Sequence, residues 1–133
     1  RERFEARVGT LYIDPPYSTD ASAIIYKNGY KDSSWLTLID QSLRSSTALA
    51  KNTAVICGSI DDTEVSGMRE VFGQSYTKQI GIGIVRANPQ SRKTSGKFSP
   101  VHEYAIFYGR TDLAQPSSLG FSQKKAERYP LVD

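Results

Sequence analysis

The amino-acid sequence predicts an α/β fold in which a mostly parallel sheet includes one antiparallel strand. Apolar runs typical of strands alternate with stretches of helical spacing through residues 8–86, and this alternation is typical of parallel sheets. The last two predicted strands, 77–86 and 101–108, are separated by a polar loop without helical spacing. We therefore expect these two strands to form an antiparallel hairpin.

The first half of the chain predicts a strand, a long loop, a helix and a second strand. The apolar run 8–13 indicates a buried strand, and the loop after it extends to about residue 31. Asp32 can cap a helix that continues to about residue 51, with Ala50 as its last apolar residue near helical spacing. Residues 53–59 form the next apolar run and predict a second buried strand.

A second helix is predicted between this strand and the hairpin. Asp61 and Glu64 have the spacing of an acidic capping box. Met68 and Phe72 then lie on one helical face, and Gly73 is expected to end the helix.

Two glycines of the third strand, Gly81 and Gly83, do not predict a cofactor-binding loop. Arg86 stands where a third glycine would be needed, and the chain continues into a loop instead of a helix. We expect both glycines on one face of the strand, where a neighbouring element packs closely. After Arg110 the sequence predicts irregular structure.

The composition predicts a soluble, cytoplasmic domain. The 133 residues suffice for one domain with a modest core, and no apolar stretch has membrane-spanning length. The single cysteine, Cys57, cannot form an intrachain disulfide and is expected to be a small buried hydrophobic residue. With one histidine in the chain, we expect no histidine metal cluster. The net charge of +3 permits a polyanionic partner without requiring one.

A short polar motif directly follows the first predicted strand. Its residues are Asp14, Pro15, Pro16 and Tyr17. They bring a carboxylate, a rigid carbonyl and an aromatic face to the carboxyl end of a strand, which is where open α/β sheets bind ligands. The same residues also make a good loop after any strand, because proline fixes φ and aspartate caps turns. Both interpretations stay open at this point.

The motif resembles the catalytic motif of amino-methyltransferases that act on DNA bases. Further segments follow in the order and spacing of the β-class adenine methyltransferases, above all the modification subunits of type III restriction systems. These segments are Ser33-Ser34-Trp35-Leu36, Gly58-Ser59-Ile60-Asp61-Asp62, Phe72-Gly73 and His102-Glu103-Tyr104. The resemblance covers about residues 8–109.

The resemblance implies a partial Rossmann-like, S-adenosylmethionine-dependent methyltransferase fold. Residues 1–110 would be the catalytic-motif half of the domain, and 111–133 an irregular tail leading toward a target-recognition region that the chain lacks. The family's Phe-x-Gly-x-Gly cofactor loop is also missing from the sequence. Two hypotheses follow: an enzyme whose cofactor loop comes from elsewhere, or a catalytically silent fragment that binds DNA or a partner.

In the family's chemistry, Asp14 and the Pro15 carbonyl would bind the amine of a flipped-out base, and Tyr17 would stack on that base. In the family, aspartate at the first position is more often associated with adenine N6 than with cytosine N4, and a cytosine-N4 methyltransferase stays as an alternative. The residues expected on the cofactor side are Asp14, Trp35, Ser59 and Asp61. Trp35 has an alternative role in the core, and Asp61 has an alternative role as a helix cap.

DNA contacts are expected from the end of the third strand and the loop after it. The candidate residues are Arg86, Arg92, Lys93, Lys97 and His102. Cations in such a run can contact phosphates, although a solvated surface loop has the same composition. The expected partners are DNA and either a restriction subunit or a second copy of the chain.

Overall fold

The computed structural model describes residues 4–17, 31–87 and 101–117. The described elements are, in chain order, β1 (Val8–Ile13), α1 (Lys31–Thr47), β2 (Ala50–Ile60), α2 (Val65–Ser75), β3 (Lys78–Arg86) and β4 (His102–Gly109). The predicted α/β order is therefore confirmed, with element ends that differ from the prediction at several places.

The four strands form one sheet in the order β1-β2-β4-β3. β1 is parallel to β2, whereas β4 is antiparallel to both β2 and β3. Three strands thus run in one direction and β4 runs against them, which confirms the mostly parallel sheet with a closing hairpin. Because β4 is reversed, its first residues lie beside the carboxyl end of β2, where Tyr104 pairs with Ile60.

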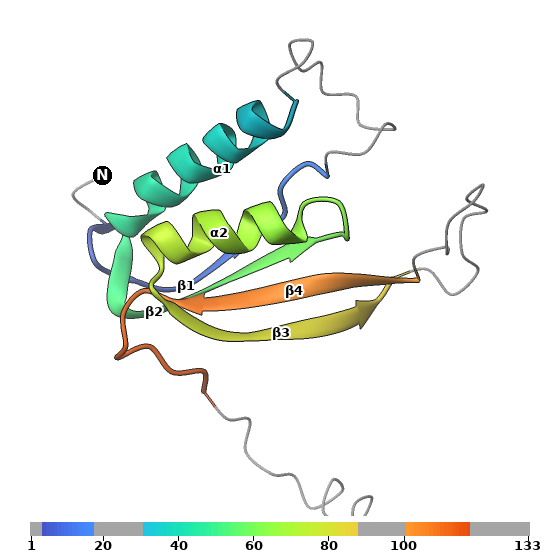
Figure 1. The fold of residues 1–133 in the computed structure, drawn as a ribbon. Coiled ribbons are helices and arrows are strands. Elements are labelled where there is room, and N and C mark those ends of the chain that lie inside the picture. The colour runs from blue at the N-terminus through green and yellow to red at the C-terminus, as the bar shows by residue number, and fades with distance from the viewer. Residues whose placement is uncertain (1–3, 18–30, 88–100, 118–133) are drawn as a thin grey trace, which may run out of the picture.

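Both helices cover the same face of the sheet (Figure 1). Trp35, Ile39 and Leu43 of α1 are spaced four residues apart and are all buried, as expected for an amphipathic helix. They pack with Met68 and Phe72 of α2 in the main hydrophobic core. The core therefore lies between the helices and one side of the sheet.

Gly58 lets α2 pack directly on β2. A Cβ atom added at Gly58 would lie 2.8 Å from Cζ of Phe72 and closer still to Cε of Met68. Such contacts are far inside van der Waals distance, so a larger residue would force the side chains of Met68 and Phe72 to move.

The opposite face of the sheet is less covered in the described part of the chain. Cys57 lies there between Tyr12 and Phe107 on the neighbouring strands, and Tyr12 is 63% exposed. Cys57 is accordingly only partly buried, whereas the sequence predicted a buried residue. The burial it does have raises the pKa of its thiol.

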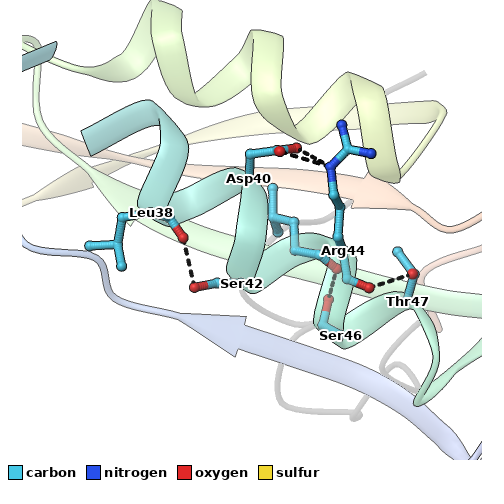
Figure 2. A network of polar contacts seen from close by, with 7 residues as sticks. Leu38, Asp40, Ser42, Arg44, Ser46 and Thr47 are labelled. Carbon is cyan, nitrogen blue, oxygen red and sulfur yellow. Dashed lines mark hydrogen bonds and ion pairs between the residues drawn. The ribbon is translucent and has the colours of Figure 1, made fainter. Parts of the chain in front are cut away.

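The first helix ends earlier than predicted, at Thr47 instead of after Ala50. The Thr47 hydroxyl donates to the carbonyl of Arg44 at 2.7 Å in the last turn (Figure 2). Two residues further on, the Leu49 carbonyl accepts a hydrogen bond from the N–H of Val8 at 2.9 Å. Ala50 therefore begins β2 opposite Val8, because pairing with β1 overrides its helical spacing. The side chain of Asp32, the predicted cap, lies outside the described residues.

Both predicted ends of the second helix are wrong. The N-cap residue is Glu64, and no side-chain hydrogen bond caps the helix there. Instead, Oδ1 of Asp61 accepts a hydrogen bond from the N–H of Thr63 at 2.9 Å and closes a turn before the helix. Gly73 lies inside α2, which continues to Ser75, since a single glycine is tolerated within a packed helix.

The glycines of β3 do not mark a close approach by a neighbour. The pairing with β4 skips a residue between Gln79 and Gly81, which is the signature of a β-bulge. Within the described residues, no atom lies within 4 Å of a Cβ added at Gly81, and the nearest atoms to one at Gly83 are at 3.8 Å. The expectation of tight packing at these positions is therefore wrong.

Candidate active site

Three segments that are distant in sequence meet at one edge of the sheet. We call this the motif edge and define it as residues 14–17, 61–62 and 102–104. Residues 14–17 follow β1, residues 61–62 follow β2, and residues 102–104 begin β4. The parallel pairing of β1 with β2 and the reversed direction of β4 bring these segments together. Two hydrogen bonds between the segments, described below, join them.

Trp35 holds the motif from the helix layer. Its indole Nε1 donates to the carbonyl of Pro16 at 2.6 Å, and its side chain is 0% exposed. This hydrogen bond occupies the carbonyl of Pro16. The neighbouring residue, Pro15, is buried. With no exposed surface, Trp35 matches its alternative role in the core better than a direct contact with cofactor.

Tyr17 is tied to β4 by its hydroxyl, which donates to Oε2 of Glu103 at 3.1 Å. Burial first, then this hydrogen bond and the negative charges of Glu103, Asp14 and Asp61, raise the pKa of Tyr17 well above its ordinary value. The hydroxyl therefore remains a neutral donor around neutral pH. The charges of Asp14 and Asp61 thus act on the hydroxyl, and Glu103 also contacts it directly.

A second tyrosine connects β4 to the residues after β2. The Tyr104 hydroxyl donates to Oδ1 of Asp62 at 2.7 Å and lies 3.0 Å from Nε2 of His102. The hydrogen bond to Asp62, followed by burial, raises the pKa of Tyr104. His102 also lies 3.8 Å from Asp62, so its ring belongs to a side-chain network of the motif edge.

The remaining predicted cofactor residues are divided between two places. Asp14 and Asp61 both lie at the motif edge. Ser59 instead pairs its hydroxyl with that of Tyr12 at 2.7 Å, on the sheet face opposite the helices. Asp14 and Asp61 thus lie at the edge where their charges act on Tyr17, whereas Ser59 faces away from the helices.

Of the predicted DNA-binding residues, Arg86 and His102 face each other across the β3–β4 pairing. Arg86 is exposed at the end of β3. The other three candidates, Arg92, Lys93 and Lys97, lie outside the described residues.

Sequence reasoning missed the part that Glu103 plays at this edge. Its hydrogen bond to Tyr17 joins residues 86 positions apart, and no local spacing indicates such a contact. The signal that was present is indirect, since Glu103 follows His102 in a segment already singled out by the family resemblance.

The chemistry of the motif edge suits an amine donor and a cation. Asp14 contributes an exposed carboxylate, and negative charge from Asp61 and Glu103 lies near the Tyr17 hydroxyl. Carboxylates favour a cationic group nearby. In the described residues, no three histidine, cysteine, aspartate or glutamate side chains are grouped so as to hold a metal ion. No helix of the described ranges has the length and apolar character needed to cross a membrane.

The sequence is similar to a type II methyltransferase and to Mod subunits of type III restriction-modification enzymes. The type II methyltransferase M.KpnI of Klebsiella pneumoniae is 29% identical over 116 residues, covering 80% of this chain and 28% of that protein. The Mod subunit of the type III restriction-modification enzyme EcoPI of Escherichia phage P1 is 24% identical, covering 94% of this chain and 24% of that protein. The chain thus spans about a quarter of the length of these relatives. No protein-family model matches it.

Solved structures agree on the fold. TTHA0409 of Thermus thermophilus, assigned as a DNA modification methylase and solved in complex with S-adenosyl-L-methionine, superposes with a TM-score of 0.65 at 12% identity. The match covers 96% of this chain and 54% of that protein. The chain is therefore homologous to type II methyltransferases and to Mod subunits of type III restriction–modification enzymes, with a methyltransferase fold of mixed strand direction.

Proposed function

We propose that this chain is the catalytic part of a DNA methyltransferase that transfers a methyl group from S-adenosylmethionine to the N6 amine of adenine. One observation carries the proposal: residues 14–17 are held at the motif edge by Trp35 from α1 and Glu103 from β4. Homology to restriction–modification methyltransferases supports it.

The base amine is the group that residues 14–17 suit best. The exposed Asp14 carboxylate and the carbonyl of Pro15 would each accept a hydrogen bond from that amine. Two acceptors favour a pyramidal nitrogen, whose lone pair is then localised for attack. The fixed φ of proline keeps the Pro15 carbonyl oriented before reaction, so little reorganisation is needed there. The Tyr17 ring would stack on the flipped base, a contact that contributes about 1–3 kcal/mol per base.

The cofactor side is proposed to include Asp14 and Asp61. S-adenosylmethionine supplies an electrophilic methyl group bonded to a positively charged sulfur. The negative charges of these two residues favour such a cation at the motif edge. We propose that a glycine-rich loop outside this sequence completes the cofactor site, since the chain has no Phe-x-Gly-x-Gly segment.

DNA contacts beyond the base are proposed at the β3–β4 end. Arg86 is exposed there, opposite His102. Arg92, Lys93 and Lys97 follow in the sequence and would add contacts to phosphates, giving affinity that falls with salt. The Mod relatives belong to restriction–modification enzymes, which favours a restriction subunit as a further partner.

A catalytically silent fragment that binds DNA or a partner is the alternative, and the missing Phe-x-Gly-x-Gly segment favours it for the isolated 133 residues. Titration calorimetry with S-adenosylmethionine, on both this chain and the full-length protein, separates the two. We expect micromolar binding by the full-length protein and transfer of a tritiated methyl group to DNA. Absence of both from the full-length protein would exclude the enzyme.

A further inference from the structure

Glu103 is not among the groups proposed to bind the base amine or the cofactor, yet it makes the contact that ties Tyr17 to the sheet. We propose that Glu103 is a positioning residue, which orients the Tyr17 ring for stacking on the target base. This inference rests on the proposed methyltransferase function. It concerns a residue that acts through Tyr17 and does not itself touch the base.

Tyr17 needs such a partner because of where it lies. It is the last described residue of the motif, four positions beyond the end of β1. Its side chain packs against the core but is only partly buried. Without a bond at the hydroxyl, the ring could rotate about its side-chain torsions. Ordering it when the base arrives would then reduce the stacking free energy.

Glu103 is well placed to supply that bond. It lies near the start of β4, opposite Val85 of β3, and the next residue, Tyr104, pairs with both Ile84 of β3 and Ile60 of β2. A residue in a paired strand is a more precise support than one on a loop. The hydrogen bond to Glu103 therefore restricts the motion of the Tyr17 ring relative to the sheet.

A carboxylate also fixes the direction of this bond. An ionised glutamate can only accept, so the tyrosine hydroxyl must donate, and bonds to a charged acceptor are stronger than neutral ones. Glutamine retains an acceptor oxygen at the same reach, so Glu103→Gln should preserve the orientation of Tyr17 in part. Glu103→Ala should lose it.

The test uses the full-length protein and a double-mutant cycle between Glu103→Ala and Tyr17→Phe, with Glu103→Gln as the conservative variant. The matched control is Glu70→Ala, since Glu70 is an exposed residue of α2. The readouts are kcat, KM for DNA, and the fluorescence of 2-aminopurine placed at the mapped target base. Stacking on tyrosine quenches that fluorescence. If Glu103 only stabilised the fold, Glu103→Ala would leave the fluorescence unchanged.

We expect Glu103→Ala to lower kcat about tenfold and to increase the fluorescence of the flipped base. Glu103→Gln should recover most of both. In the Tyr17→Phe background, Glu103→Ala should have no further effect, because the hydroxyl that it holds is gone. Effects that simply add, or a Glu103→Ala variant with parental kcat and fluorescence, would overturn the inference.

A spectroscopic measurement that needs no catalysis separates this inference from the proposed function. In the protein labelled with ¹³Cζ-tyrosine, the Tyr17 signal at neutral pH should move in Glu103→Ala and stay at the parental position in Glu70→Ala, because only the first variant removes the carboxylate that accepts from the hydroxyl. A Tyr17 signal that does not move in Glu103→Ala would overturn the contact itself. If the signal moves but the parent transfers no methyl group, the contact is real and the proposed function fails, together with the role in stacking.

Discussion

The two edges of the sheet use their polar side chains in opposite ways. At the motif edge, carboxylates lie near the Tyr17 hydroxyl, and Asp14 is exposed. At the opposite edge, which we define as residues 75–78 and 109–114, side chains donate to backbone carbonyls. β4 runs from one edge to the other, beginning at the motif edge with His102 and ending at the opposite edge with Gly109.

At the opposite edge, side-chain hydrogen bonds join residues 75–78 to residues 110–114. Nη1 of Arg110 donates to the carbonyl of Ser75 at 2.9 Å. Nζ of Lys78 donates to the carbonyls of Asp112 and Ala114, at 3.0 and 2.8 Å. These contacts attach the irregular segment after β4 to the sheet, and Ala114 is fully buried there.

This difference separates a functional edge from a structural one. Donors bonded to backbone carbonyls satisfy groups that would otherwise lose hydrogen bonds on burial, so they contribute to stability. An exposed carboxylate at the end of a strand satisfies no such group and remains available for a ligand. We therefore expect substitutions at the motif edge to reduce catalysis and substitutions at the opposite edge to reduce stability.

The largest effect is expected at Asp14. Asp14→Ala should lower kcat by about 10³, because it removes one of the two acceptors for the amine, and should leave the melting temperature within about 1 °C. The matched control is Asp112→Ala, an exposed aspartate at the opposite edge whose backbone carbonyl, not its carboxylate, accepts from Lys78. Methyl-transfer rates and thermal unfolding measure both. Comparable activity in the two variants would contradict the claim that the motif edge serves catalysis and the opposite edge serves stability.

An intermediate effect is expected at Trp35, where stability and catalysis are both affected. Trp35→Phe keeps an aromatic ring in the core but removes the donor to Pro16, so we expect a kcat reduced about tenfold and a loss of about 1–2 kcal/mol in unfolding free energy. Tyr76→Phe is the control, since it removes the 2.7 Å bond between Tyr76 and Ser46, far from the motif. It should lose similar stability with a parental kcat. Equal kcat in both variants would refute a positioning role for Trp35.

The smallest effect on catalysis is expected at Arg110. Arg110→Ala removes the bond to the Ser75 carbonyl and the contact with the Tyr76 ring, 6.0 Å from its centroid. We expect a loss of about 1–3 kcal/mol in unfolding free energy and an unchanged kcat below the melting transition. Arg69→Ala, at an exposed position of α2, should change neither quantity. Urea denaturation and steady-state kinetics measure them, and a reduced kcat in Arg110→Ala would show that the two edges are coupled.

The sequence was sufficient for features that depend on local pattern. Apolar periodicity predicted the strands and helices, and the reversed β4 followed from a hairpin without an intervening helix. The end of α1 could not be predicted, because it depends on the pairing of Val8 with Ala50 from another strand. The site shows the same limit. Its motif could be identified from residues 14–17, but the support from Trp35 and Glu103 depends on contacts made only in the fold.

The most direct test of the central claim is the nucleoside composition of DNA after incubation with the full-length protein and S-adenosylmethionine. Enzymatic digestion followed by mass spectrometry identifies the methylated base and its position. We predict N6-methyladenine with the parent protein and about 10³-fold less in the same time with Asp14→Ala. Detection of N4-methylcytosine would identify cytosine as the substrate base, and the proposed amine chemistry of the motif edge would still hold. The absence of any methylated amine would contradict the account.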